Sequence, residues 1–522
     1  MGDGLERASG RQRRPGAHKT IRAMTVIALG ASLAACAVGP DYRTPAPPPG
    51  KQYTATPLPA QTVATQGLAG DAGHAQHFVA TQDIPGQWWT LFHCAPLDAL
   101  IRQALDNSPT LAAAQAALRQ SQENLNAEVG SALFPAFDAK LGASRQKTSG
   151  LTIGQPGRDS IFNLYNASVS VSYSLDLFGG ARRQLEALGA QVDYQRYQWQ
   201  AAYLALTANL VTASIKEASL RAQIEATERI AGDQRHQLDL LSRQFELGGV
   251  NQAAVLAQRT TLAQTLAALP PLRQALDVTR HQIAVLAGRP PSDGSLPEFR
   301  LSDFSLPQDL PVSLPSALVR QRPDILAADA TLHAASAKVG VATAEMYPQL
   351  NITGSYGTDA LTPAGAFRAS NAIWSLGAGL LQPLFHGGQL LSQKRAAEAA
   401  YDQAAAQYRQ TVLQAFQNVA DTLRALDNDA HALNAQADAE RAARASLDLS
   451  QQQYRLGAVS YLSLLDSQRQ YQQSVVNLVQ AQAARYADTA ALFQAVGGGW
   501  WHDQSKQTQQ ADAAKASMEK NR

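Results

Sequence analysis

Few side chains in this sequence have the spacing that catalysis or metal binding requires. The 10 histidines show neither the H-x-x-x-H nor the H-E-x-x-H spacing with which one helix face holds a metal ion. The chain also lacks the phosphate-binding motif G-x-x-x-x-G-K-[ST] and the nucleophile motif G-x-S-x-G. We therefore expect a protein that is not an enzyme and that has no catalytic residues, no metal site and no bound cofactor.

One of the two cysteines, Cys36, has a clear chemical context. Six Lys and Arg residues between positions 7 and 22 precede the apolar run 23–35, which ends directly at Cys36. This order is typical of a secretory signal peptide. The stretch Leu33-Ala34-Ala35-Cys36 resembles the bacterial lipoprotein signal, in which the cysteine thiol carries a lipid. We expect residues 1–35 to be removed and Cys36 to be lipidated, the alternative being an ordinary signal with a chance cysteine.

Composition and charge exclude several classes of protein. The 522 residues are 45% hydrophobic but only 7% aromatic, with alanine and glutamine dominant in the helical stretches. The net charge of +2 becomes −2 once the signal peptide is gone, which removes the electrostatic argument for a nucleic-acid partner. No apolar run reaches the roughly 18 to 20 residues of a membrane-spanning helix, so a helical membrane protein is not expected.

The chain contains an internal tandem repeat. Motifs recur in the same order in both halves, about 210 residues apart. Examples are Leu177-Phe-Gly-Gly180 with Leu384-Phe-His-Gly-Gly388, and Phe245-Glu-Leu-Gly248 with Tyr454-Arg-Leu-Gly457. We predict six segments: signal peptide 1–35, lipid anchor and extended tether 36–95, first repeat 96–288, proline-rich linker 289–314, second repeat 315–496, and C-terminal tail 497–522.

Each repeat is predicted to run helix, two strands, very long helix, helix. Apolar residues alternate with small or polar ones in four segments, which is typical of strands with one apolar face: 137–144, 167–175, 350–356 and 374–380. Leucine and other apolar residues recur at helical spacing over 181–247 and 389–456, each about 100 Å long as a helix. The shorter helices are expected at 96–130, 251–288, 315–345 and 460–496, so that two laid end to end match one long helix.

Four amphipathic strands are too few to close a barrel, because a barrel filled by side chains already takes about eight. Open strand edges are not tolerated in a bilayer, so the strands must be shared between chains. Two copies would give eight strands and three would give twelve, and spacing alone does not choose between these numbers.

Several motifs together resemble the TolC-like outer-membrane efflux factors, more narrowly the NodT-type lipoproteins of resistance-nodulation-division pumps. They include Val38-Gly-Pro-Asp-Tyr42, Trp88-Trp89, Arg322-Pro-Asp-Ile325 and Gly497-Gly-Gly-Trp500. The resemblance implies a mixed α and transmembrane β fold: a homotrimer with a 12-stranded barrel in the outer membrane and a long periplasmic coiled-coil tunnel. It also implies passive export of small molecules, with a periplasmic adaptor and an inner-membrane resistance-nodulation-division transporter as partners, and a lipid-anchored location in the outer membrane.

The resemblance also assigns roles to the turns that follow the two long helices. Gly248 and Gly457 can adopt the left-handed backbone that a sharp helix reversal needs. We expect these turns to be the periplasmic tips that dock on the adaptor, the alternative being that the glycines only end the helices. The tips are formed by Leu247, Gly248, Gly249, Val250, Leu456, Gly457, Ala458, Val459 and Ser460.

A periplasmic gate is expected just beyond the second tip, where Leu462, Asp466 and Arg469 share one helix face. In the resembled family the matching residues narrow the closed entrance. Around a three-fold axis Asp466 would form an acidic ring, whose repulsion Arg469 or a bound cation must offset. The alternative is an exposed ion pair worth under about 1 kcal/mol. The matching residues of the first repeat are uncharged: Ala253, Ala257 and Thr260.

Three other functions compete with small-molecule efflux. The same architecture could serve a type I secretion system that exports polypeptides. A lipid-anchored coiled-coil scaffold would show one helical hairpin flanked by strands, in place of two repeated units. A surface-displayed enzyme would need a catalytic constellation, which the sequence lacks.

Overall fold

The computed structural model describes residues 37–46, 52–67, 70–80, 83–149, 154, 157 and 159–501. The predicted signal peptide, Cys36 and most of the predicted tail lie outside these residues. The chain divides into two compact units. The sheet unit contains 37–44, 120–192 and 330–405, and the helix unit contains 45–46, 52–119, 193–329 and 406–501.

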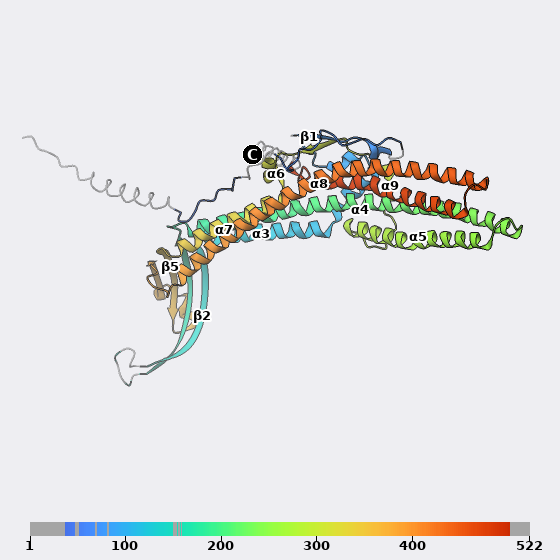
Figure 1. Cartoon of the computed structure of the whole chain (residues 1–522). Helices are drawn as coiled ribbons and strands as arrows, with labels where there is room; N and C mark the ends of the chain where they lie inside the picture. Colours follow the sequence, from blue (N-terminus) through green and yellow to red (C-terminus); the bar gives the residue numbers. More distant parts are fainter. Residues whose placement is uncertain are drawn as a thin grey trace, which may run out of the picture. The chain divides into compact units, whose positions relative to one another are not determined.

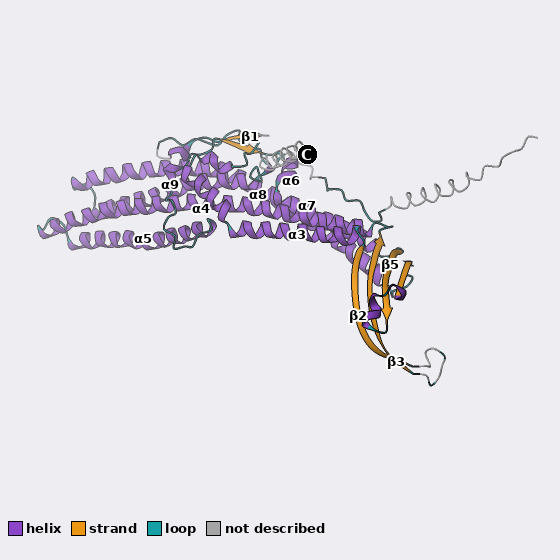
Figure 2. Ribbon diagram, turned by 180° about the vertical axis from the view of Figure 1, so that it is seen from behind, coloured by secondary structure: helices purple, strands orange, loops and turns teal. Residues whose placement is uncertain are grey.

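The sheet unit holds one antiparallel sheet of four strands, drawn as orange arrows in Figure 2. The strands are β2 (Ala136–Thr148), β3 (Ser160–Leu175), β5 (Gln349–Ala360) and β6 (Ala372–Leu381), in the spatial order β2-β3-β5-β6. All four predicted strands are present. The contact between β3 and β5, with Val169 opposite Tyr356, joins a strand of the first repeat to one of the second.

The alternation in sequence places large apolar side chains on an exposed face of this sheet. Phe137 and Leu141 on β2 and Trp374 and Leu376 on β6 are all exposed within the chain. Two short 3-10 turns, η5 (Pro363–Phe367) and η6 (Ala369–Asn371), connect β5 to β6. An exposed apolar band of this kind is what a strand presents to an apolar medium or to another chain.

The two longest helices have equal length in the two repeats. Helix α4 (Gly180–Glu246) and helix α8 (Gln389–Arg455) each have 67 residues. They are followed by α5 (Gln252–Leu286) and α9 (Tyr461–Ala495), with 35 residues each. Figure 1 labels all four helices. Within the described residues, no helix is both long enough and apolar enough to span a membrane.

The two other helices predicted as continuous are each broken near their start. Residues 96–130 form α2 (Ala95–Asn107) and α3 (Pro109–Leu133), and residues 315–345 form α6 (Pro315–Gln321) and α7 (Pro323–Ala344). Both breaks precede a proline, at Ser108 and Arg322, whose backbones are extended. A proline ring disfavours helical geometry in the preceding residue, so the prediction of single helices was wrong at the same place in each repeat.

The regions predicted as an extended tether and a linker contain folded structure. Residues 70–92 form η1 (Gly70–Gly73), β1 (His77–Ala80) and η2 (Trp88–Phe92). Strand β1 pairs in parallel with β4 (Asp309–Val312), which follows η4 (Leu301–Asp303) in the predicted linker. The prediction of an extended tether was therefore wrong for residues 70–92, and the predicted linker contains β4. Strands this short leave little periodicity to read in the sequence.

The core of the helix unit includes an aromatic cluster around Trp88. The Trp88 ring stacks on Phe493 of α9 with 5.4 Å between ring centroids, and Trp89 and Phe92 complete the cluster. Gly499 has φ +70°, and a Cβ there would lie 2.3 Å from the Ile84 carbonyl oxygen. The glycines 497–499, predicted as the start of the C-terminal tail, thus form a packed turn.

Candidate functional site

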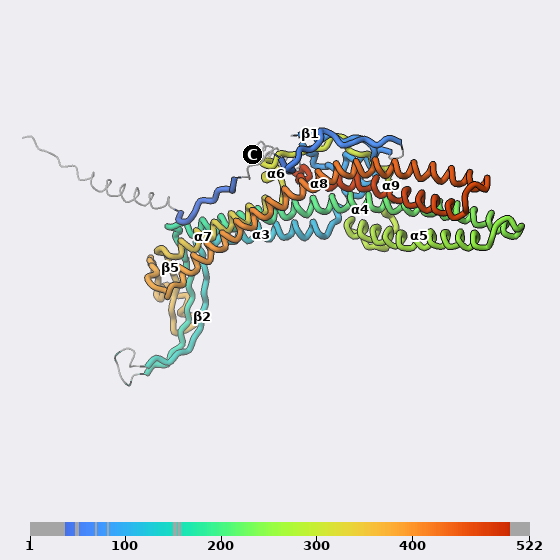
Figure 3. The backbone as a smooth tube through the Cα atoms, viewed as in Figure 1, coloured from blue at the N-terminus to red at the C-terminus, as the bar shows by residue number. Residues whose placement is uncertain are grey.

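The turns at the ends of the two long helices have the same backbone geometry. After α4, the N–H of Gly249 donates to the Gln244 carbonyl at 2.7 Å, and after α8 the N–H of Ala458 donates to the Gln453 carbonyl at 2.8 Å. Gly248 and Gly457 have φ of +73° and +76°. Left-handed glycines with such hydrogen bonds are a common way to end a helix, which explains the repeated Leu-Gly pair. Figure 3 shows the trace passing from α4 to α5 and from α8 to α9.

Side chains cap the helices that start after each turn. The Asn251 side chain accepts a hydrogen bond from the N–H of Ala254, and the Ser460 hydroxyl accepts one from the N–H of Ser463. Such caps satisfy donors that the first turn of a helix leaves free. Each reversal is therefore fixed at both sides by local interactions.

The predicted tip residues divide into exposed and packed side chains. Leu247 and Leu456 are 86% and 84% exposed. Val250, by contrast, packs against a buried cluster formed by Leu241, Tyr461, Leu464 and Leu465. The Tyr461 hydroxyl also donates to the Gln258 side chain at 2.6 Å. Each tip therefore offers one exposed leucine, and the first tip rests on a rigid apolar base.

The structure brings the three predicted gate residues onto one exposed face of α9. An Arg469 guanidinium nitrogen lies 3.8 Å from the Asp466 carboxylate, and both side chains are more than half exposed. The Gln470 amide donates to the same carboxylate at 2.9 Å, and Leu462, one turn earlier, is exposed. The neighbouring Leu464 and Leu465 of the same helix are buried against Leu241 and Tyr461. Within one chain this geometry is a weak surface ion pair.

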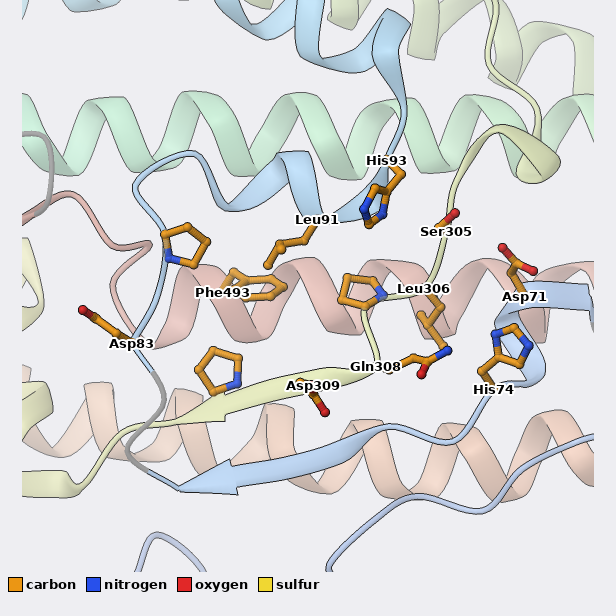
Figure 4. Close-up of a pocket in the computed structure, with 13 residues that line it drawn as sticks. Asp71, His74, Asp83, Leu91, His93, Ser305, Leu306, Gln308, Asp309 and Phe493 are labelled. Atoms are coloured by element: carbon orange, nitrogen blue, oxygen red, sulfur yellow. The ribbon is translucent and has the colours of Figure 1, made fainter.

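A pocket of about 730 Å³ lies in the helix unit beside β4 and α9 (Figure 4). Its floor is apolar, with Leu306, Pro307 and Phe493 buried. Asp71 and His74 lie at one end of the view and Asp83 at the other. In the described part of the chain, no group of three or more His, Cys, Asp or Glu residues could hold a metal ion.

A buried charged cluster on α8 and α9 was missed by the sequence analysis. Arg485 is almost fully buried and donates to the carbonyls of Leu426 and His74 at 3.1 and 3.0 Å. Burial lowers the pKa of Arg485 to about 10, although Asp429 and Asp488 oppose this. Burial, followed by a hydrogen bond with Asp429, raises the pKa of Asp488 to about 7. Single charges in an alanine-rich helix gave no signal of this arrangement.

Cys94 is buried, and burial raises the pKa of its thiol. A thiol is reactive as its thiolate, which burial disfavours. Cys94 is therefore a small packing residue.

Comparison with known proteins identifies the family. The sequence profile of the family described as "Outer membrane efflux protein" matches residues 100–289 and 314–498. The pyoverdine export outer membrane protein OpmQ of Pseudomonas putida is 30% identical over 92% of this chain and 98% of its own length. The toluene efflux pump outer membrane protein TtgC of P. putida is 27% identical over 94% and 98%.

A solved structure shows the same fold. The structure of the outer-membrane channel OprN matches with a TM-score of 0.79 and 28% identity, covering 89% of this chain and 100% of that chain. The helices and the four-stranded sheet described above therefore adopt the fold of an outer-membrane channel protein. The chain belongs to the outer membrane efflux protein family, and it is an outer-membrane channel protein of efflux, not an enzyme.

Proposed function

We propose that the protein is the passive exit duct of a tripartite pump, receiving small molecules from an inner-membrane resistance-nodulation-division transporter through a periplasmic adaptor. Three copies would supply twelve strands for an outer-membrane barrel, with the long helices forming a periplasmic tunnel. The observation that supports this best is the sheet β2-β3-β5-β6, whose exposed apolar side chains and open edges at β2 and β6 suit a barrel shared between chains.

The exposed leucines of the two tips support the docking of an adaptor. No other side chain of the described residues buries Leu247 or Leu456. Large exposed apolar side chains at a well-defined turn are suited to binding another protein. The equal backbone geometry of the two tips would let one type of partner element engage both, giving six similar contacts around a trimer.

The gate on α9 controls passage in this proposal. Three copies of Leu462 would make an apolar constriction that disfavours water, and three copies of Asp466 would make an acidic ring. Because like charges repel, the ring needs Arg469 or a cation to stay closed. The weak pair within one chain leaves Arg469 free to exchange partners between neighbouring subunits.

Replacing Asp466 by alanine is expected to raise the ion conductance of reconstituted trimers several-fold. Without the Asp466 carboxylates, Arg469 has no acidic partner in a neighbouring subunit, and the contacts that would keep the entrance closed are lost. Single-channel recording in planar bilayers measures this. Asp438→Ala is the matched control, because Asp438 pairs with Arg441 three residues on and is about as exposed. Equal conductance of the wild type and Asp466→Ala would contradict the gate.

Cys36 is proposed to carry the lipid that anchors the mature chain in the outer membrane. The test compares a deletion strain with strains that produce the wild type or a Cys36→Ser variant behind an ordinary secretory signal. Deletion is expected to raise accumulation of a fluorescent pump substrate, and the wild type to restore export. By mass spectrometry, the wild type should carry the added mass of the acyl chains, and the Cys36→Ser protein should not. An unchanged accumulation after deletion would contradict the proposed duct.

Export of polypeptides by a type I secretion system is the alternative function. The names of the relatives, which specify pyoverdine export and toluene efflux, favour small molecules. Loss of secretion of a polypeptide from the deletion strain, with normal accumulation of small molecules, would favour the alternative.

A further inference from the structure

The first described residues of the chain lie in a close-fitting site on the sheet unit. We name residues 37–42 the N-terminal strap. The N–H of Val38 donates to the Phe178 carbonyl at 3.0 Å, in the turn between β3 and α4. Arg183, in the first turns of α4, donates from Nε to the Val38 carbonyl at 3.3 Å and from Nη2 to the Asp41 carboxylate at 2.8 Å. The strap is thus held through both its backbone and its charge.

Arg183 is buried although its partner on the strap is not. Its side chain is 7% exposed, whereas that of Asp41 is 89% exposed. The other guanidinium nitrogen donates to Glu186 at 2.7 Å. Burial alone would lower the pKa of Arg183, but the hydrogen bonds to Asp41 and Glu186 raise it. A guanidinium buried beneath a short exposed segment loses contacts when that segment leaves, which favours the docked state.

Two glycines allow the strap to approach the helices closely. Gly39 has φ +101°, and a Cβ on it would lie 2.4 Å from the Cα of Gly340 in α7. Gly179 has φ +81°, and its Cβ would lie 2.6 Å from the Cα of Ala37. Contacts below 3 Å cannot be accommodated without moving the backbone. The fit is therefore specific for glycine at these positions and for this path of the strap.

The far end of the strap is held by a second set of contacts. The Tyr42 ring stacks on His333 of α7 with 4.3 Å between ring centroids and an interplanar angle of 12°. His333 Nε2 lies 2.9 Å from the Glu186 carboxylate. Glu186 therefore contacts both Arg183 and His333, so one carboxylate links the two groups that hold the strap. Hydrogen bonds from these two groups lower the pKa of Glu186 against the opposing effect of burial.

We propose that Arg183, Glu186 and His333 form a receptor site for the mature N-terminus, and that this site holds residues 37–42 in place without help from the lipid. The site fixes the residue after Cys36 at the turn between β3 and α4. The proposed lipid then inserts from a defined point of the sheet unit, in place of the end of a free tether. The strap has its own binding energy and adds a second attachment to that of the acyl chain.

The test is the rate of trypsin cleavage after Arg43, which follows the strap directly. Cleavage needs an undocked chain and so reports the population of the open form. In full-length protein purified in detergent, Arg183→Met should speed release of the fragment 36–43 at least about tenfold, since hydrogen bonds to a charged group are lost. Mass spectrometry measures the fragment. The control Arg196→Met removes an arginine from an exposed pair with Asp193 on the same helix and should leave the rate unchanged.

A second variant separates undocking from unfolding. Gly39→Val changes the strap alone and should also speed cleavage about tenfold or more, because the added side chain meets Gly340. Its helix content and thermal midpoint should match those of the wild type. Wild-type cleavage rates in both Arg183→Met and Gly39→Val would overturn the proposal.

The Cys36→Ser variant behind an ordinary secretory signal tests independence from the lipid. Its cleavage should stay as slow as that of the wild type. Fast cleavage in this variant would show that the lipid holds the strap, which also overturns the proposal. The assay needs no pump or adaptor, so its result is separate from that of the export assay.

Discussion

Replacing Arg485 by methionine is expected to lower the free energy of unfolding by about 3–5 kcal/mol. Its side chain is buried, with 1% of the residue exposed, and it donates to Leu426 and His74 carbonyls on separate parts of the helix unit. A methionine side chain fills similar space but has no hydrogen-bond donor. The two backbone carbonyls therefore lose the hydrogen bonds that the charged guanidinium supplies. The carboxyls of Asp429 and Asp488 also lose the one positive charge that lowers the pKa of Asp488.

Thermal or chemical unfolding of the purified protein, followed by tryptophan fluorescence and circular dichroism, measures this loss. Arg196→Met is the matched control, since Arg196 pairs with Asp193 on an exposed face, and it should change stability by about 0.5 kcal/mol or less. A stability loss no larger than that of the control would show that Arg485 is not needed for the fold of this unit.

Replacing Trp88 by alanine should destabilise the helix unit by about 3–5 kcal/mol, because a large buried side chain is removed and a cavity remains. Trp88 has no exposed surface and stacks on Phe493, and a Cβ on Gly498 would lie 3.4 Å from its indole nitrogen. Loss of the ring would therefore loosen both the C-terminal end of α9 and the glycine turn that follows it.

The comparison is with Trp374→Ala on β6. Trp374 is 76% exposed within the chain, so the same chemical change removes little buried surface there. The midpoint of unfolding in detergent should fall strongly for Trp88→Ala and much less for Trp374→Ala. Equal shifts would contradict the assignment of Trp88 to the core.

The sequence predicted those parts of the fold in which apolar residues recur with a clear period. Alternation of apolar and small residues predicted four strands, and long runs of helical spacing predicted α4 and α8. The breaks before Pro109 and Pro323 could have been predicted too, because a proline constrains the preceding residue. The helical period on both sides of each proline was read as continuous, and this was the error.

Contacts between residues far apart in sequence could not be predicted in this way. Strand β1 has four residues, too few to show a period, and its partner β4 lies in a proline-rich stretch. Arg485 and Arg183 are charged residues in largely polar helices, and only the fold shows that they are buried. Burial of a charge depends on which segments cover it, and periodicity within one helix carries no such information.

The candidate site was predicted as far as it depends on local structure. The Leu-Gly pairs at 247–248 and 456–457 gave the positions of both helix reversals, and the spacing of Leu462, Asp466 and Arg469 gave their shared face. The roles of adaptor docking and gating involve other chains, so they stay predictions for the conductance and accumulation assays. The strap was noticed in the sequence only as the motif Val38-Gly-Pro-Asp-Tyr42, whose contacts explain each of its polar and small residues.

The pairing of β1 with β4 also sets an order for the folding of the chain. The Gln76 side chain reaches the Pro307 carbonyl across 231 residues, and Arg485 reaches the His74 carbonyl across 411. Helical hairpins such as α4 with α5 close over short loops and can form early, whereas contacts of such long range form late. Segment 60–62 pairs with one edge of β1, but the other edge stays open until β4 is available, and an open strand edge is prone to aggregate. The region around β1 is therefore expected to complete its structure after the helices, as one of the last parts of the helix unit to fold.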